Sequence, residues 1–284
     1  MAAGGGTLSD LWRRRAGAVH VPAEGADLPD GASRTARSEG GGMSAHLSIR
    51  NLIKRFGGLT ATNDFSLEIT PGSSVGLIGP NGAGKTTIFS QIMGEVRQDS
   101  GQIALDGLEL TPLATARRIR AGVSRTYQVP RPFAEMSVAE NIRVGLMPDN
   151  IWSMIAQGPD PDRELELALS VGFTKDQLEK LPSELSMGDL RKLEMARTMA
   201  TGPRMMLLDE VFAGLTVGEI AMISGLVQQM RADGMTFLIV SHDLKALEPL
   251  IDRAVAINHG TLIADGPYDE VMNDAAVRAS YLGT

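Results

Sequence analysis

A glycine-rich run between residues 79 and 87 has the clearest capacity for chemistry. It reads Gly79-Pro80-Asn81-Gly82-Ala83-Gly84-Lys85-Thr86-Thr87 and fits the pattern G-x-x-x-x-G-K-[ST]. Glycines let backbone N–H groups turn toward phosphate oxygens, and a following helix N-terminus adds partial positive charge. Lys85 would reach the β- and γ-phosphates, and the Thr86 hydroxyl would hold Mg²⁺. The run predicts binding of a nucleoside triphosphate rather than a chance glycine turn.

Two apolar segments end in residues that could act on such a ligand. Met205–Leu208 is followed by Asp209 and Glu210, and Thr236–Val240 is followed by His242 after one serine. Ligands of open parallel sheets lie beyond the carboxyl ends of the strands, so these residues should meet the glycine run at one edge. We expect Asp209 to support Mg²⁺, Glu210 to activate water as a general base, and His242 to contact the γ-phosphate. Alone, the acidic pair would indicate a solvated turn and the histidine a structural role.

A third candidate is the junction Leu185-Ser186-Met187-Gly188-Asp189, which opens a helix-like segment. A serine hydroxyl, a glycine backbone and a helix N-terminus can together hold an anion. The same residues also fit a capping box, in which Ser186 and Asp189 each satisfy the other's backbone. Both readings can hold, because a hydroxyl can cap the helix in one state and touch phosphate in another.

The elements that position these residues alternate between strands and helices, which indicates an α/β domain with a parallel sheet. A buried strand precedes the glycine run and a helix begins at Thr87. The expected strands, with a hairpin arm at residues 260–266, are Leu47–Ile49, Ser66–Ile69, Ser74–Ile78, Met205–Leu208, Thr236–Val240 and Ala254–Asn258. Strand signals vanish between about Gln128 and Leu185. Residues 137–144, 162–171 and 175–181 are predicted helices, so a helical insertion is expected over about 129–187.

The composition of the 284 residues limits the class of protein. Hydrophobic residues make up 43%, enough for a large core, and the net charge of −7 gives no sign of a general nucleic-acid binder. The absence of cysteine excludes disulfides, thiolate metal sites and cysteine nucleophiles. Apolar runs such as Phe237–Val240 are far shorter than the ~20 residues that cross a bilayer. No secretory signal is visible, so the sequence predicts a soluble cytoplasmic chain.

Residues 1–42 differ from the remainder of the chain. They are rich in Gly, Ala, Ser and Arg, and their five basic and five acidic residues cancel. Such a composition predicts disorder. An alternative is a mis-assigned extension, with translation beginning at Met43, just before the first predicted strand. Intact mass of the native protein with Met1 retained would contradict that alternative.

Taken together, these segments resemble the nucleotide-binding subunits of ABC transporters, from about His46 to Thr284. Gly79–Thr87 matches the Walker A loop, Met205–Glu210 Walker B, Leu185–Asp189 the signature, and Ser241–Asp243 the switch histidine. Gln128 matches the Q-loop glutamine and Phe56 the aromatic residue that stacks on adenine. The resemblance implies a P-loop NTPase (RecA-like) core with a parallel sheet, an antiparallel β subdomain and a helical insertion subdomain, from 43 to 284.

The resemblance also implies an activity, a Mg²⁺-dependent hydrolysis of ATP. Two copies, or this chain and a related one, would close head to tail, so that Ser186 and Gly188 of one chain meet ATP held by the other. Gln128 would serve Mg²⁺ and relay the nucleotide state to a membrane permease.

A subfamily is also indicated. Lys54–Leu59, Arg125–Gln128, Phe133–Ile142 and the final Tyr281-Leu282-Gly283 resemble branched-chain amino-acid importers. This implies a subunit peripheral to the cytoplasmic face of a bacterial inner membrane, with separate permeases and, indirectly, a periplasmic substrate-binding protein. Lipopolysaccharide-export ATPases share parts of the pattern. Urea or amide import, lipopolysaccharide export and a soluble non-transport ABC ATPase therefore remain alternatives.

Two positions depart from the family pattern. Asp189 stands where the signature usually has glutamine, and a carboxylate beside triphosphate would repel it unless it faces away as a helix cap. We expect the cap. Thr216 stands where many members carry Asp or Asn, which affects communication between two sites rather than hydrolysis.

Overall fold

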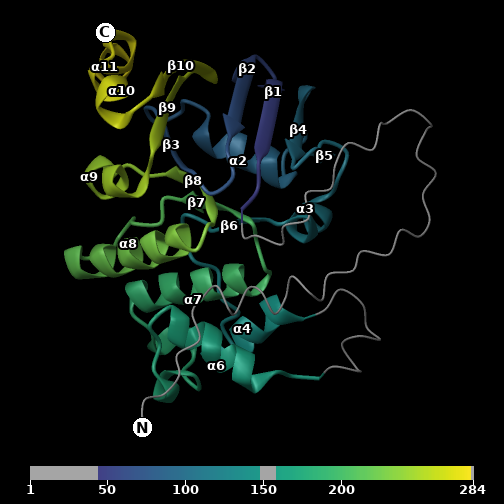
Figure 1. Cartoon of the computed structure of the whole chain (residues 1–284), viewed down its shortest axis with the longest axis vertical. Coiled ribbons are helices and arrows are strands. Elements are labelled where there is room, and N and C mark those ends of the chain that lie inside the picture. The colour runs from purple at the N-terminus through teal and green to yellow at the C-terminus, as the bar shows by residue number, and fades with distance from the viewer. Residues whose placement is uncertain (1–43, 148–157, 283–284) are drawn as a thin grey trace, which may run out of the picture. The chain divides into compact units, whose positions relative to one another are not determined.

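A computed structural model of the chain describes residues 44–147 and 158–282, which form two β-sheets and the helices around them (Figure 1). The expected extension at residues 1–42 lies outside the described residues, and its disorder stays a prediction.

The larger sheet has the strand order β10-β9-β3-β8-β7-β6. Neighbouring strands from β9 to β6 are parallel, and β10 pairs with β9 as an antiparallel hairpin arm. The strands are β3 (Ser74–Ile78), β6 (Val123–Arg125), β7 (Met205–Asp209), β8 (Thr236–Val240), β9 (Arg253–Asn258) and β10 (Thr261–Gly266). Every residue of β3, β7 and β8 is buried, as expected for parallel strands covered on both faces. The predicted bounds of β3 and β8 are confirmed.

The smaller sheet is antiparallel and has the order β2-β1-β4-β5. Its strands are β1 (Leu47–Phe56), β2 (Leu59–Ile69), β4 (Ser100–Leu105) and β5 (Leu108–Glu109). A parallel-containing sheet beside an antiparallel one confirms the predicted fold class. Sequence patterns missed β4, β5 and the short β6, because two of them have only two or three residues and β4 mixes polar with apolar positions.

The helices of the first half are α2 (Lys85–Met93), α3 (Thr115–Ala121), α4 (Val138–Leu146) and α6 (Pro161–Ser170). Those of the second half are α7 (Met187–Ala200), α8 (Val217–Ala232), α9 (Leu244–Leu247), α10 (Tyr268–Asn273) and α11 (Ala275–Leu282). Short 3₁₀ turns are η1 (Lys175–Gln177), η2 (Pro182–Glu184) and η3 (Glu248–Leu250). Within residues 44–147 and 158–282, no helix is both long and apolar enough for a membrane crossing.

Helices α4, α6 and α7 pack together at one end of the domain, away from β1, β2 and β4 (Figure 1). The first begins with a capping box, in which Glu140 N donates to Ser137 Oγ and Ser137 N donates to Glu140 Oε2. The predicted α-helix at residues 175–181 is wrong, since only the 3₁₀ turn η1 forms there. Pro182 has no N–H to continue a helix. The carbonyls of residues 178 and 180 instead accept from the first turn of α4.

Candidate functional site

The glycine run forms the loop between β3 and α2, and its shape requires glycine. Gly84 caps α2 with a φ of 108°, in the left-handed region. A Cβ there would lie 2.4 Å from the carbonyl oxygen of Ala61, and one at Gly79 would lie 2.3 Å from that of Ile257. Both neighbours are backbone atoms, one in β2 and one in β9, so main-chain packing leaves no room for a side chain at either position.

Lys85 is buried inside this loop. Its Nζ donates to the carbonyl oxygens of Gly79 at 2.6 Å and Pro80 at 3.0 Å. Burial lowers the pKa of Lys85, and the nearby charges of Glu210 and Asp209 oppose that shift. The ammonium group therefore lies at the base of the loop, with two acidic residues close enough to support its charge.

A cleft of about 410 Å³ opens over the loop and brings most of the predicted residues together. Gly82 to Thr87 and Asn81 form its floor. Gln128, Glu210 and His242 reach it from three other segments, and Phe56 lies at its side. Pro80 borders an adjoining hollow instead. Gly79, Asp209, Ser186 and Gly188 are not among the residues that line the cleft.

Glu210 lies at the end of β7 in a conformation that is uncommon for a residue with a side chain. Its φ is 51°, a strain that typically costs about 1–3 kcal/mol and is retained where function requires it. Its Oε2 accepts from His242 N at 3.0 Å, while its buried Oε1 has no hydrogen-bond partner in the described residues. That oxygen lies 3.2 Å from His242 Nε2. A buried carboxylate with an unused oxygen beside a phosphate loop can accept a proton from water.

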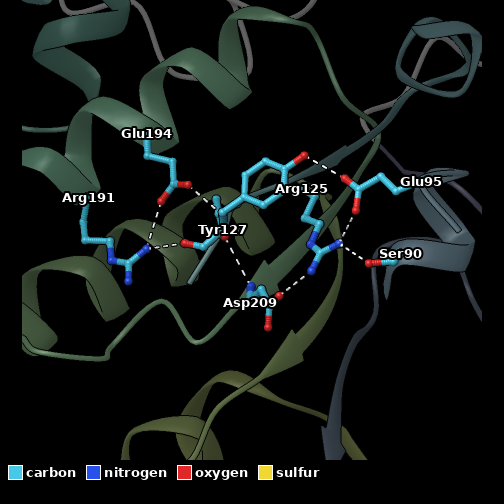
Figure 2. Close-up of polar contacts among 8 residues, drawn as sticks. Ser90, Glu95, Arg125, Tyr127, Arg191, Glu194 and Asp209 are labelled. Atoms are coloured by element: carbon cyan, nitrogen blue, oxygen red, sulfur yellow. Dashed lines mark hydrogen bonds and ion pairs between the residues drawn. The ribbon is translucent and has the colours of Figure 1, made fainter. Parts of the chain in front are cut away.

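Asp209 is held just below the cleft by Arg125. Arg125 Nη2 lies 2.6 Å from Asp209 Oδ2, and both side chains are buried (Figure 2). The backbone N–H of Asp209 donates to Thr126 Oγ1 at 3.3 Å. One carboxylate oxygen thus stays outside the ion pair.

The oxygen groups predicted for Mg²⁺ are those of Thr86, Gln128 and Asp209, and their chemistry fits this hard cation. In the described part of the chain, no group of three or more His, Asp or Glu residues could hold a metal. Mg²⁺ usually binds through one or two carboxylates together with substrate phosphates. The donor set therefore fits Mg²⁺ that arrives with a nucleotide.

The predicted anion site at the start of α7 is held by a residue that sequence reasoning missed. Ser186 caps the helix by accepting from Asp189 N at 3.1 Å. The return half of the predicted capping box is wrong, because the Asp189 carboxylate pairs with Lys192 Nζ at 2.7 Å. Glu219 Oε1 instead accepts from Gly188 N at 3.0 Å and from Ser186 Oγ at 3.5 Å.

Glu219 belongs to the capping box of α8, which it forms with Thr216. These hydrogen bonds, first those from Thr216, lower the pKa of Glu219, so it carries a charge at neutral pH. The spacing Thr216-x-x-Glu219 could have revealed the cap. No local signal reveals the contact with Gly188.

Two further residues lie at the phosphate loop, although the sequence patterns assigned neither of them a role in the site. His259 lines the cleft. Tyr281, in α11, accepts a hydrogen bond through Oη from Gly79 N at 2.9 Å. Burial raises the pKa of Tyr281, which keeps its hydroxyl neutral. The C-terminal helix therefore braces the first residue of the phosphate loop.

Comparison with known proteins places this constellation in a family. A family model described as "ABC transporter" matches residues 62–213, which include the phosphate loop, Gln128, Ser186 and Glu210. The chain belongs to the ABC transporter family. A second model, "Branched-chain amino acid ATP-binding cassette transporter", matches residues 261–284 of this ABC cassette, where Tyr281 lies.

Individual relatives agree with this assignment. The cassette is 36% identical over 248 residues to the high-affinity branched-chain amino acid transport ATP-binding protein LivG of Escherichia coli K12, covering 84% of this chain and 97% of LivG. It is 34% identical over 250 residues to BraF of Pseudomonas aeruginosa, which bears the same description, with the same coverage of 84% and 97%. A crystal structure of an ATP-binding cassette in its ADP conformation superposes with a TM-score of 0.74 at 28% identity, covering 84% of this chain and 99% of that one. The protein is an ATP-binding cassette ATPase.

Proposed function

We propose that this cassette hydrolyses ATP in the cleft over the phosphate loop and thereby drives uptake of branched-chain or related amino acids through separate permease subunits. The observation that carries the catalytic part is the meeting of Lys85, Gln128, Glu210 and His242 in one cleft. The match of residues 261–284 to the branched-chain family and the names of LivG and BraF support the cargo. They favour this importer over lipopolysaccharide export, urea or amide import, and a soluble ATPase.

The chemistry follows from positioning and electrostatics. The amides from Gly82 to Thr87 and the Lys85 ammonium would bind the phosphates, and Phe56, whose ring is half exposed, would stack on the adenine. Glu210 would accept a proton from the attacking water through Oε1, which has no hydrogen bond within the described residues. His242, 3.2 Å from that oxygen, would hold a γ-phosphate oxygen and orient the carboxylate.

Mg²⁺, when bound with the nucleotide, would neutralise charge on the phosphates. Thr86, Gln128 and Asp209 would hold it, and Arg125 keeps the Asp209 carboxylate oriented below the cleft.

The assembly we propose has three further partners. A second ATP-binding subunit, the same chain or a related one, would present its Ser186 and Gly188 to this chain's nucleotide. Permease subunits would place the cassette at the cytoplasmic face of the bacterial inner membrane, as a peripheral protein. A periplasmic substrate-binding protein would deliver the amino acid, and the net charge of −7 argues against a nucleic-acid partner.

Glu210→Gln tests the catalytic role. The amide keeps the shape of the side chain but cannot take a proton, so we expect ATP binding to persist while turnover falls by about 10²–10⁴-fold. Measuring nucleotide affinity and phosphate release on the same preparation separates the effect on ATP binding from the effect on turnover. Glu109→Gln, on the exposed strand β5, is the control that should leave both unchanged. Wild-type hydrolysis by Glu210→Gln would remove Glu210 from this role.

The cargo is tested separately in the native host. Deleting the gene should abolish high-affinity uptake of labelled leucine, isoleucine or valine, and Glu210→Gln should not restore it. Unchanged uptake of all three would contradict the cargo and leave the ATPase proposal intact.

A further inference from the structure

One buried arginine of α7 connects the signature segment to two residues that line the cleft, Gln128 and Glu210. Arg191 is only 1% exposed and lies near the start of the helix that Ser186 caps. Its Nη1 donates to the carbonyl oxygen of Tyr127 at 2.5 Å, and its Nη2 donates to that of Gln128. The same Nη2 lies 3.4 Å from the carbonyl oxygen of Glu210. A single guanidinium therefore contacts the backbone of Gln128 and of Glu210.

Glu194, one turn further along α7, completes the connection. Its Oε2 pairs with Arg191 Nη1 at 3.0 Å, and its Oε1 accepts from Tyr127 N at 2.7 Å (Figure 2). Both backbone polar groups of Tyr127 are thus bound by side chains of one helix. Burial raises the pKa of Glu194, and the hydrogen bond from Tyr127 and the charge of Arg191 oppose that shift.

Stability alone is a poor explanation for this arrangement. A buried ion pair often contributes no more to stability than well-packed apolar side chains would. Arg191 Nε is buried and has no hydrogen-bond partner within the described residues, so the guanidinium is not fully satisfied. Its other bonds reach three carbonyls on two loops that border the cleft. Arg191 is therefore placed so as to hold these two loops in position, and not so as to satisfy all of its own hydrogen-bond donors.

We propose that Arg191, held by Glu194, is a positioning residue for ATP hydrolysis. It fixes the backbone at Gln128 and Glu210, so that their side chains stay placed in the cleft for Mg²⁺ and for the attacking water. Ser186 and Gly188 begin the same helix. When that end of α7 binds a nucleotide held by a partner chain, Arg191 therefore also transmits the change in helix position to Gln128 and Glu210. The proposal rests on the roles given to Gln128 and Glu210 under the proposed function.

The test separates positioning from stability with three variants. Arg191→Met should lower kcat by about 100-fold, the typical effect of misplacing a catalytic group by ~1 Å, with little change in ATP affinity. Arg191→Lys keeps the charge without the planar fork and should recover only part of the loss. If Arg191→Met leaves Glu194 unpaired and fails to fold, Arg191→Met/Glu194→Leu removes both charges and keeps the site apolar. A folded double variant should still show the kcat loss.

Arg118 provides a matched control. It is also buried, at 2% exposure, and also donates to backbone carbonyls, those of Leu113, Gln91, Ile92 and Thr111. None of these borders the cleft. Arg118→Met should lower the melting temperature while the folded protein keeps its kcat.

A second readout follows the proposed relay directly. In the Glu210→Gln background, ATP should slow hydrogen exchange of the Tyr127 amide. Arg191→Met, which leaves Glu194 Oε1 in place to accept from that amide, should abolish the ATP-dependent protection. Unchanged protection in folded Arg191→Met, or wild-type kcat in the folded double variant, would overturn the proposal. If Glu210→Gln itself kept full turnover, the proposed function would fail first, whatever Arg191 does.

Discussion

The phosphate loop and the start of α7 both offer backbone N–H groups at a helix N-terminus, but they are held in different ways. Main-chain packing fixes the phosphate loop, where a Cβ at Gly84 would meet a carbonyl oxygen at 2.4 Å. The start of α7 is held by the partly buried Glu219, whose carboxylate accepts from Gly188 N and Ser186 Oγ. The first loop is therefore preorganised for phosphate. The second already holds an anion, which a phosphate would have to replace.

This difference matches the division of labour expected for a shared site. A loop whose backbone is held by packing can bind nucleotide within one chain, since its main chain needs no rearrangement. A loop satisfied by its own side chain becomes available only when a stronger anion is presented to it. The predictions below test whether the two loops differ as the geometry implies.

The largest effect is expected from Gly84→Ala. The new Cβ meets the backbone of Ala61, which cannot move away, and φ is 108° at this position. Such strained substitutions cost about 1–3 kcal/mol of unfolding free energy, and the displaced loop should lose ATP affinity as well. Denaturant unfolding and nucleotide titration measure both. Wild-type stability and affinity would show that the loop is not fixed by its backbone.

Gly188→Ala should spare stability and affect only the pairing of two subunits. Its Cβ would also lie 2.4 Å from a neighbour, but that atom is Glu219 Oε1, the end of a flexible side chain. We expect an unfolding free energy within about 0.5 kcal/mol of wild type, normal ATP binding by the single chain, and weaker ATP-driven association. Sedimentation in the Glu210→Gln background measures association. A loss of stability as large as that of Gly84→Ala would show that the start of α7 is fixed as rigidly as the phosphate loop.

The smallest effect is expected from Glu219→Gln. The amide keeps one acceptor oxygen, so it can accept at Thr216 or at Gly188 but not at both, and it removes the negative charge that competes with phosphate. ATP-driven association should tighten a few-fold, with no change in ATP binding by the single chain. Glu248→Gln, an acid-to-amide change away from Gly188, is the control. Weaker association of Glu219→Gln would show that the carboxylate stabilises the pair of subunits and does not compete with the phosphate for Gly188 N.

Sequence reasoning succeeded where the information is local. The bounds of β3 and β8 and the place of the phosphate loop follow from short apolar runs and a fixed spacing of glycines, which need no knowledge of distant residues. The meeting of Glu210 and His242 with the phosphate loop follows from one topological rule about strand ends, whereas Phe56 and Gln128 were expected there only from the family resemblance.

The contacts that hold these residues in place could not be predicted, because they join distant parts of the chain. Gly188 and Glu219 are 31 positions apart, and Arg125 and Asp209 are 84 apart. The predicted return cap from Asp189 failed because Lys192, on the next turn, offers its carboxylate a charged partner. Local patterns show which groups are available, whereas the fold decides which of them meet.

The central claim is that the phosphate loop and the start of α7 complete one site from two chains. Mixing two inactive variants tests it most directly: Lys85→Met disables the phosphate loop, and Ser186→Arg disables the start of α7. Each variant alone should lack ATPase activity. In a mixed pair, one site joins the intact phosphate loop of the Ser186→Arg chain to the intact Ser186 of the Lys85→Met chain, so mixing should restore hydrolysis. A mixture as inactive as either variant alone, at a concentration where the wild-type chain hydrolyses ATP, would contradict the shared site.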